Sequence, residues 1–343
     1  MIKKVVVALF VFFLMYISYI GYVKYQSIFE PNVHIKEEDS SELFIPTGTT
    51  FPDLINIVKS SDVLKDHESF EWVAGKKNLK NHVHPGRYLL KNGMSNNELV
   101  NLLRSGNQKP VRVIVRSTRS KEAFSGLIAK QIESDSVSIL QMLNEQSLFD
   151  VEDQKVSWMV LCIPNTYELF WNTNADQFFK RMTREYNSFW NNDRKLKSEK
   201  IGMDCKEVSV LASIVQQETV MDDEKPVVAG VYMNRLNKGM RLEADPTLIF
   251  AVGDFTIKRV LDKHKEVESP YNTYKYSGLP PGPICMPTIS SIDAVLNYEK
   301  HKYLFFCAKE DFSGYHNFAS SYSQHRKNAR KFRRELNKRR IWN

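Results

Sequence analysis

The chain has 343 residues, of which 42% are hydrophobic and 26% are charged, a composition that excludes a largely disordered chain. Its length allows two modest domains that each bury a core. The formal net charge of +8 indicates an anionic partner. Much of the excess positive charge lies in one C-terminal run, residues 326–334, so the net charge alone does not identify the class of partner.

The N-terminal region has the composition of a membrane-spanning helix. Lys3 and Lys4 precede an uncharged apolar stretch over residues 5–23, which ends in a tyrosine-rich segment. As a helix this stretch spans roughly 28 Å at ~1.5 Å per residue, enough to cross a bilayer core. A cleaved signal peptide would have a shorter apolar region and a small-residue cleavage site, which is not seen after Val23. We therefore predict a cytoplasmic tail over residues 1–4, a single transmembrane anchor over 5–23, and a body outside the cytoplasmic membrane.

A mixed, acidic segment over residues 24–41 follows, and we expect it to be a short linker. Residues 42–108 then carry, in order, signals for a strand, two helices and a strand, and a further helix that begins at Ser95 with a capping box completed by Glu98. This layout resembles a LysM-like β-α-α-β module, a small fold associated with glycan strands. A packing subdomain without glycan contact fits the layout equally well.

Residues 109–343 predict a larger, mostly helical domain with a few strands, so the expected fold class is α+β. We expect the basic C-terminal helix to pack its apolar stripe on this domain and to leave its charges in solvent. The predicted elements are a strand at 110–115, helices at 121–133, 136–144 and 177–197, an aromatic loop or edge strand at 163–171, and a hairpin formed by 303–308 and 316–319.

The strongest candidate for chemistry is Glu218. Leu211, Ile214 and Val215 form one helical stripe, and Glu218 occupies the next position on it. A carboxylate at such a position is costly to bury as an anion, so we predict a raised pKa, as a general acid requires. The competing interpretation is a structural carboxylate held by a buried arginine such as Arg235.

Polar residues on the following segments suggest a cleft around this acid. On the helix predicted over residues 227–237, Asn234 shares a stripe with two valines, so we expect Glu218 and Asn234 to face one cleft. Asp245 precedes Pro246, and two roles for it fit the sequence equally well: the N-cap of a short helix or a contact to the substrate. The segment 278–284 is rich in proline, which removes the N–H donors that a phosphate loop requires.

Tyr271, Asn272 and Tyr274 precede that proline-rich segment and combine stacking with hydrogen bonding, as sugar-binding sites do. His316 is either a second catalytic group or a structural histidine on a strand.

We predict no metal site and no cofactor, because His82 and His84 have no neighbouring third ligand. The cysteines lack paired spacing, and we favour free thiols over two disulfides for Cys162, Cys205, Cys285 and Cys307.

Taken in order, five segments resemble the motifs of the endolytic murein transglycosylase (MltG or YceG-like) family, and they cover residues 211–219, 232–236, 239–247, 271–274 and 278–284. The resemblance spans nearly the whole chain and places the catalytic glutamate of the family on Glu218. Many members carry a charged pair before this glutamate, where this chain has Gln216 and Gln217.

The resemblance implies a lyase, a lytic transglycosylase anchored in the inner membrane with its catalytic domain in the periplasm. It would cut the bond between N-acetylmuramic acid and N-acetylglucosamine in nascent peptidoglycan and so terminate strand elongation. One carboxylic acid, Glu218, would protonate the leaving oxygen and then assist attack by the C6 hydroxyl, which gives a 1,6-anhydro end. The expected substrate-binding residues are Gln217, Asn234, Arg235, Asp245, Thr247, Tyr271, Asn272, Tyr274 and His316.

The expected partners are peptidoglycan glycan strands and penicillin-binding-protein synthases, while the orientation of the anchor argues against a nucleic acid. Two other functions stay open. One is a hydrolytic muramidase that pairs Glu218 with Asp245 or Glu243. The other is a non-catalytic scaffold that binds glycan within the machinery of cell-wall synthesis.

Overall fold

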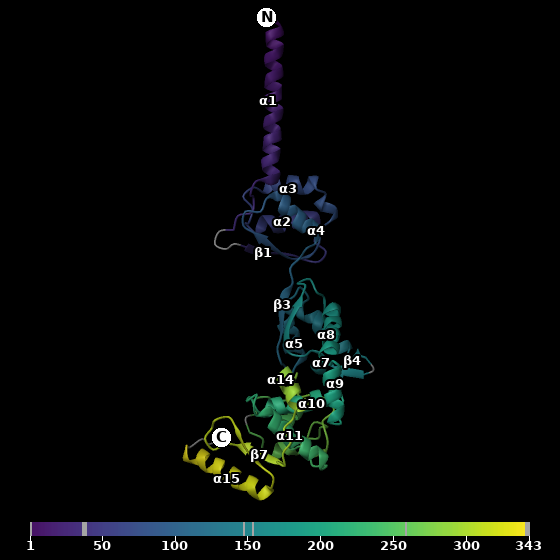
Figure 1. Ribbon diagram of the computed structural model, residues 1–343, viewed down its shortest axis with the longest axis vertical. Helices are drawn as coiled ribbons and strands as arrows, with labels where there is room; N and C mark the ends of the chain where they lie inside the picture. Colours follow the sequence, from purple (N-terminus) through teal and green to yellow (C-terminus); the bar gives the residue numbers. More distant parts are fainter. Residues whose placement is uncertain (1, 36–39, 147, 153, 258, 340–343) are drawn as a thin grey trace. The chain divides into compact units, whose positions relative to one another are not determined.

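The computed structural model describes residues 2–35, 40–146, 148–152, 154–257 and 259–339, which form a mixed arrangement of helices and short strands (Figure 1). The chain divides into two compact units. The first unit contains Met1–Val113, Lys130–Ser134 and Glu168–Asn174, and the second contains Ile114–Ala129, Asp135–Tyr167 and Ala175–Asn343.

The first element, α1 (Ile2–Phe29), is an exposed helix that is long and apolar enough to cross a membrane. It continues beyond the predicted anchor, because its last turn is held by the first unit: the Asn96 amide donates to the Ser27 carbonyl at 2.9 Å. The segment after α1 is also packed, since Asn32 and Val33 are only 5% and 1% exposed. The prediction of a linker over 24–41 is therefore wrong for residues 24–35, and residues 36–39 lie outside the described part of the chain.

The first unit has the predicted order of strand, helix, helix and strand. β1 (Ser40–Ile45) pairs in antiparallel register with β2 (Gly86–Lys91), and α2 (Phe51–Ser60), α3 (His67–Lys76) and the 3₁₀ turn η1 (Leu79–Asn81) lie between them in the chain. α4 (Asn96–Ser105) follows, and Ser95 and Glu98 form the predicted capping box. Alternate strand residues point into one apolar core, which includes Leu43, Ile45, Tyr88 and Leu90.

The second unit is mostly helical. Two antiparallel strand pairs join β4 (Leu148–Val151) to β5 (Gln154–Ser157) and β7 (Phe305–Ala308) to β8 (His316–Ala319), the last being the predicted hairpin. β3 (Val111–Val115) pairs with β6 (Asn165–Leu169), and each of these two strands has residues in both units. The helices are α5 (Lys121–Ala129), α6 (Ser136–Glu145), α7 (Trp158–Leu161), α8 (Ala175–Phe189), α9 (Asn192–Lys200), α10 (Cys205–Glu218), α11 (Lys225–Asn237), α12 (Asp245–Val252), α13 (Asp262–Lys265), α14 (Ile289–Leu296) and α15 (Tyr322–Lys338).

One long helix predicted over residues 177–197 is in fact two helices, α8 and α9. The break falls at Trp190 and Asn191, where the Asn191 side chain accepts a hydrogen bond from the Arg194 backbone N–H at 3.1 Å and caps α9. The Trp190 side chain is buried at this corner.

The core of the second unit is built around α10, whose residues 208–215 are all buried. α10 contacts α11, α12 and α14, and α14 also contacts α11 (Figure 1). α15 packs on the hairpin of β7 and β8. A side chain at the end of α10 is therefore fixed by the best-packed part of the unit.

Candidate active site

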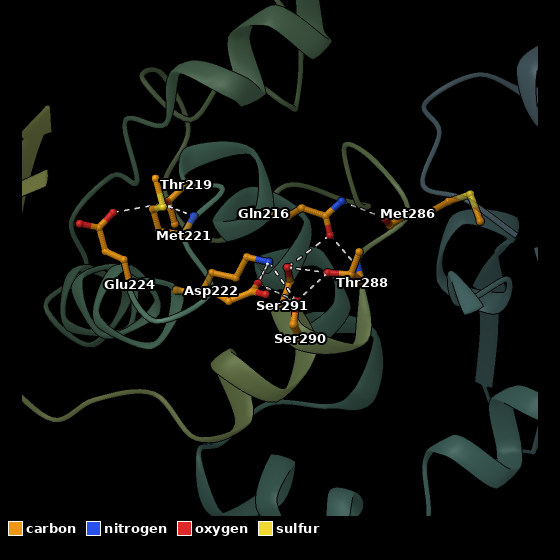
Figure 2. Close-up of polar contacts among 10 residues, drawn as sticks. Gln216, Thr219, Met221, Asp222, Glu224, Met286, Thr288, Ser290 and Ser291 are labelled. Atoms are coloured by element: carbon orange, nitrogen blue, oxygen red, sulfur yellow. Dashed lines mark hydrogen bonds and ion pairs between the residues drawn. The ribbon is translucent and has the colours of Figure 1, made fainter. Parts of the chain in front are cut away.

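Helix α10 carries Glu218 as its last residue. The helix begins with the predicted capping box between Asp204 and Glu207, and it ends because Thr219 adopts an extended backbone conformation. Gln216 holds this end against the segment that leads into α14: its side-chain oxygen accepts from the Thr288 N–H at 2.6 Å, and its amide donates to the Met286 carbonyl at 3.3 Å (Figure 2). The backbone under Glu218 is thus fixed on one side.

The turn after Glu218 is fixed on the other side by a second set of hydrogen bonds. The Thr219 hydroxyl donates to Glu224 at 3.0 Å and accepts from the Met221 N–H at 3.1 Å (Figure 2). The Glu224 carboxylate also accepts from the His316 backbone N–H at 2.7 Å and lies 2.7 Å from His316 Nδ1. His316 therefore ties the C-terminal hairpin to this turn, which is the structural role considered for it.

Glu218 lies in a pocket of about 270 Å³. Part of its side chain remains accessible to solvent through the pocket, while protein atoms surround the rest. The Tyr232 hydroxyl, from α11, donates to Glu218 Oε1 at 2.5 Å. The lining residues are Glu218, Tyr232, Arg235, Leu242, Glu243, Asp245, Tyr274, Phe305, Phe306, Tyr322 and His325.

The surroundings of Glu218 change its acidity as predicted. Burial raises the pKa of Glu218 to about 7, and the negative charge of Asp245 acts in the same direction. The Tyr232 hydrogen bond and the positive charge of Arg235 lower this pKa, but they do not offset the burial. A substantial fraction of Glu218 is thus protonated at neutral pH, so the group can both donate and accept a proton.

Arg235 does not form a salt bridge with Glu218, so this arginine does not hold that carboxylate as the structural interpretation expects. The Arg235 guanidinium is buried and forms a salt bridge with Glu243 at 3.1 Å, and it also donates to the carbonyls of Leu242 and Leu304. It fixes the wall of the pocket and contributes positive charge from there.

We expect Tyr232→Phe to raise the pKa of Glu218 above about 7, because the lost hydrogen bond stabilises the ionised carboxylate. An acid must be protonated in the free enzyme, so kcat/KM should fall as the pH rises through this pKa. The basic limb of the pH profile should therefore move to higher pH, with a loss of about tenfold or less at the optimum. An unshifted limb would show that Glu218 does not act as the acid.

Two further carboxylates line the same pocket. Asp245 does not cap α12: the cap position is Ala244, and Asp245 instead accepts a hydrogen bond from the Tyr274 hydroxyl at 2.6 Å. Glu243 has a positive φ of 50°, a conformation that is strained for a residue with a side chain. The site therefore holds one partly protonated carboxyl group and two others that hydrogen bonds or a salt bridge keep in place.

The predicted cleft between Glu218 and Asn234 is not formed. The Asn234 amide donates to the carbonyls of His301 at 2.8 Å and Tyr303 at 3.0 Å, and so holds the segment that enters β7. Tyr232, two residues earlier, is the α11 residue that reaches Glu218. Asn234 thus supports the pocket wall and is not a lining residue.

Other predicted contact residues also lie outside the pocket, because the fold uses their polar groups. The Thr247 hydroxyl donates to the Ala244 carbonyl at 2.7 Å, and the Asn272 amide donates to the carbonyls of Lys265 and Val267. Both side chains are fully buried, so neither is free for a ligand.

Tyr271 and Gln217 are likewise engaged within the protein. The Tyr271 ring packs on Phe250 with 4.8 Å between ring centroids. The Gln217 side chain accepts from Arg119 and donates to Cys285 Sγ at 3.3 Å, so it does not point freely into solvent. Of the predicted contact residues, Arg235, Asp245 and Tyr274 line the pocket with Glu218.

Several lining residues were not predicted from the sequence. Phe305 and Phe306 come from the hairpin, and Tyr322 and His325 come from the first turns of α15, far from Glu218 in the chain.

A larger cavity of about 430 Å³ at the N-terminal end of α10 is not a competing acid site, because its carboxylates, Glu152, Glu199 and Asp204, are exposed.

Comparisons with known proteins show the family to which the sequence is similar. The family model described as "YceG-like family" matches residues 43–331. The endolytic murein transglycosylase of Bacillus subtilis (strain 168) is 27% identical over 325 residues, which cover 90% of this chain and 88% of that protein. The endolytic murein transglycosylase of Streptococcus pneumoniae serotype 2 (strain D39) is 23% identical over 299 residues, which cover 77% of this chain and 53% of that protein.

A solved structure is similar in fold. It is the 2.6 Å crystal structure of a YceG-like protein from Listeria monocytogenes, which matches with a TM-score of 0.52 and 24% sequence identity. The match covers 84% of this chain and 98% of the other.

Proposed function

The chain belongs to the YceG-like family, and from this membership and the pocket around Glu218 we propose that it is an endolytic peptidoglycan lytic transglycosylase, a lyase that acts on a polysaccharide. The observation that carries the proposal is the single carboxyl group whose pKa is raised to about 7, placed in a pocket rich in aromatic and polar side chains. The named relatives are endolytic murein transglycosylases, which supports the same substrate.

In the proposed mechanism, Glu218 donates its proton to the oxygen that links N-acetylmuramic acid to N-acetylglucosamine. The bond to C1 breaks, and the positive charge that develops at C1 is stabilised by the nearby Asp245 carboxylate. The Glu218 carboxylate, which accepts from Tyr232, then takes the proton of the C6 hydroxyl as that oxygen attacks C1. The product is a 1,6-anhydro end, and Glu218 regains its proton.

A hydrolytic muramidase is the second candidate, and one observation favours it. Asp245 and Glu243 line the same pocket as Glu218, so a second carboxylate is present that water-based cleavage could use. The two reactions differ in the nucleophile that reaches C1, a water molecule or the C6 hydroxyl.

Mass spectrometry of digested glycan strands separates the two reactions. We expect the full chain to release strands whose new muramic acid ends are lighter by one water than those from a hydrolase. Reduction with borohydride is a control, because an anhydro end has no reducing sugar and should not react. More reducible ends in the digest than in the undigested strands would refute the transglycosylase and favour the hydrolase, and an unchanged substrate would favour a non-catalytic scaffold.

We also propose how the chain is placed in the cell. α1 would anchor it in the inner membrane with Lys3 and Lys4 on the cytoplasmic side, and the catalytic domain would lie in the periplasm. Residues 42–108 would act as a LysM-like glycan-binding module, a proposal supported by their strand–helix–helix–strand layout. A penicillin-binding synthase would supply the nascent strand that the enzyme cuts.

A further inference from the structure

Helix α15 has two distinct faces. Its half-buried or buried residues, among them His325, Asn328 and Phe332, lie on one arc of the helix and pack toward β7 and β8. The opposite arc is exposed and strongly basic, and it carries Arg326, Lys327, Arg330, Lys331, Arg333, Arg334 and Lys338.

The first turns of α15 belong to the catalytic pocket. Tyr322 and His325 line it, and Tyr322 is 62% exposed, so much of its side chain is accessible to a ligand at the pocket. The Arg326 guanidinium lies 6.0 Å from the centroid of this ring, and Arg330 donates back to the Arg326 carbonyl at 3.3 Å. Tyr322, Arg326 and Arg330 are therefore a continuous row at spacings of four residues, which extends roughly 12 Å away from the pocket at ~1.5 Å per residue.

The cations of this row are available for a ligand. Within the described part of the chain, the carboxylates paired with α15 are Glu310, which lies 4.0 Å from Lys331, and Glu335, which lies 2.8 Å from Lys338. Arg326 and Arg330 form no salt bridge with a described residue. Arg326 and Arg330 are both exposed, and guanidinium groups fit carboxylates because each presents planar donors that bind both oxygens of the group.

We propose that Tyr322, Arg326 and Arg330 form a subsite that extends the catalytic pocket, in which the tyrosine ring stacks on a sugar and the arginines bind carboxylates carried by the same glycan strand. The inference rests on the proposed function, because it takes the ligand to be peptidoglycan, whose muramic acid residues carry carboxyl-bearing side groups. The row begins at Tyr322, which lines the same pocket as Glu218, and this favours a strand held for cleavage over a membrane lipid as its ligand.

Strand binding by a catalytically inactive full chain tests the proposal separately from the reaction. Full-length Glu218→Gln in detergent micelles is titrated with fluorescently labelled, uncrosslinked glycan strands, so that no cleavage interferes. Adding Arg326→Gln and Arg330→Gln to this chain should weaken binding about tenfold, with a smaller loss at high salt. The same pair of substitutions should have little effect on strands whose carboxyl groups have been converted to methylamides.

A matched control removes the same charge from another part of the helix. Lys327 and Lys331 each follow a residue of the row and so lie roughly a quarter turn around α15 from it, so Lys327→Gln with Lys331→Gln should weaken binding less than about twofold. Tyr322→Ala should weaken binding to native and amidated strands alike, while Tyr322→Phe should bind both as the parent does. Equal losses for the two charge pairs would overturn the subsite, because they would indicate diffuse attraction.

A last experiment adds phosphatidylglycerol to the micelles and asks whether this anionic lipid displaces the bound strands. If the lipid does not displace the strands, the row acts on the glycan, as proposed. If the lipid displaces them and the Arg326 and Arg330 substitutions abolish that displacement, the row binds lipid headgroups and the proposal is wrong.

Discussion

Glu218→Gln is expected to lower the rate of glycan cleavage by at least about a thousandfold, because the amide can neither protonate the leaving oxygen nor accept a proton from the C6 hydroxyl. The measurement is the release of new strand ends per unit time from labelled, uncrosslinked strands. Glu199→Gln, which alters an exposed glutamate on α9, is the control and should leave the rate unchanged. A Glu218→Gln chain that retains a tenth of the activity would rule out Glu218 as the acid.

Asp245→Asn distinguishes the two candidate reactions in the same assay. A hydrolase that needs two carboxylates should lose as much activity as with Glu218→Gln. In the transglycosylase the Asp245 carboxylate only stabilises charge at C1, so the expected loss is smaller, about ten- to a hundredfold. The Tyr274 hydroxyl donates to Asp245 at 2.6 Å and can still donate to the asparagine oxygen, so the local structure should persist.

The stability of Glu218→Gln shows whether the loss of activity comes from the chemistry or from unfolding. The folded chain holds the Glu218 proton up to about pH 7, against an ordinary value of 4.5, so ionisation opposes folding above pH 4.5. The neutral glutamine avoids this cost, and we expect the variant to be more stable than the native chain by about 1–3 kcal/mol at pH 8. The difference should disappear below pH 4.5, which urea unfolding at pH 8 and pH 4 can measure.

The parts of the fold that were predicted depend on local signals. The capping boxes at Ser95 and Asp204 involve residues three positions apart, so the sequence shows them directly. The break between α8 and α9 was missed because no glycine or proline marks it, and the burial of Trp190 is a tertiary effect. The extension of α1 was missed for a similar reason, since contacts with the first unit hold its last turn.

The site was predicted only where one helix determines it. Glu218 could be identified because its position on an apolar stripe is costly for a carboxylate, and the raised pKa confirms that argument. Asn234 was predicted from its place on an apolar helical stripe and Asn272 as a hydrogen-bonding group for a sugar, but backbone carbonyls accept from their amides. Tyr232 and Tyr322 were missed because only the packing of α11 and α15 brings them to Glu218.

Gly230→Ala should damage both the stability and the activity of the second unit, because nothing larger than hydrogen fits at this position. A Cβ atom on Gly230 of α11 would lie 2.3 Å from the Glu299 carbonyl oxygen and 2.6 Å from His301 Nε2. The backbone there cannot move easily, since the Glu299 N–H donates to the Pro226 carbonyl at 3.0 Å and His301 Nε2 lies 2.9 Å from the Val227 carbonyl. We expect a loss of about 2–4 kcal/mol in the free energy of unfolding.

The activity should fall as well, because the displaced segment continues into β7, whose Phe305 and Phe306 line the catalytic pocket. Gly126→Ala is the matched control: this glycine lies inside α5, and a Cβ atom there would meet nothing within 4 Å. Alanine is the better helix former, so the control should gain up to about 1 kcal/mol. Urea unfolding of both variants in detergent measures the difference. Similar stabilities would mean that residues 299–301 do not pack on α11, and the wall of the pocket would then need another support.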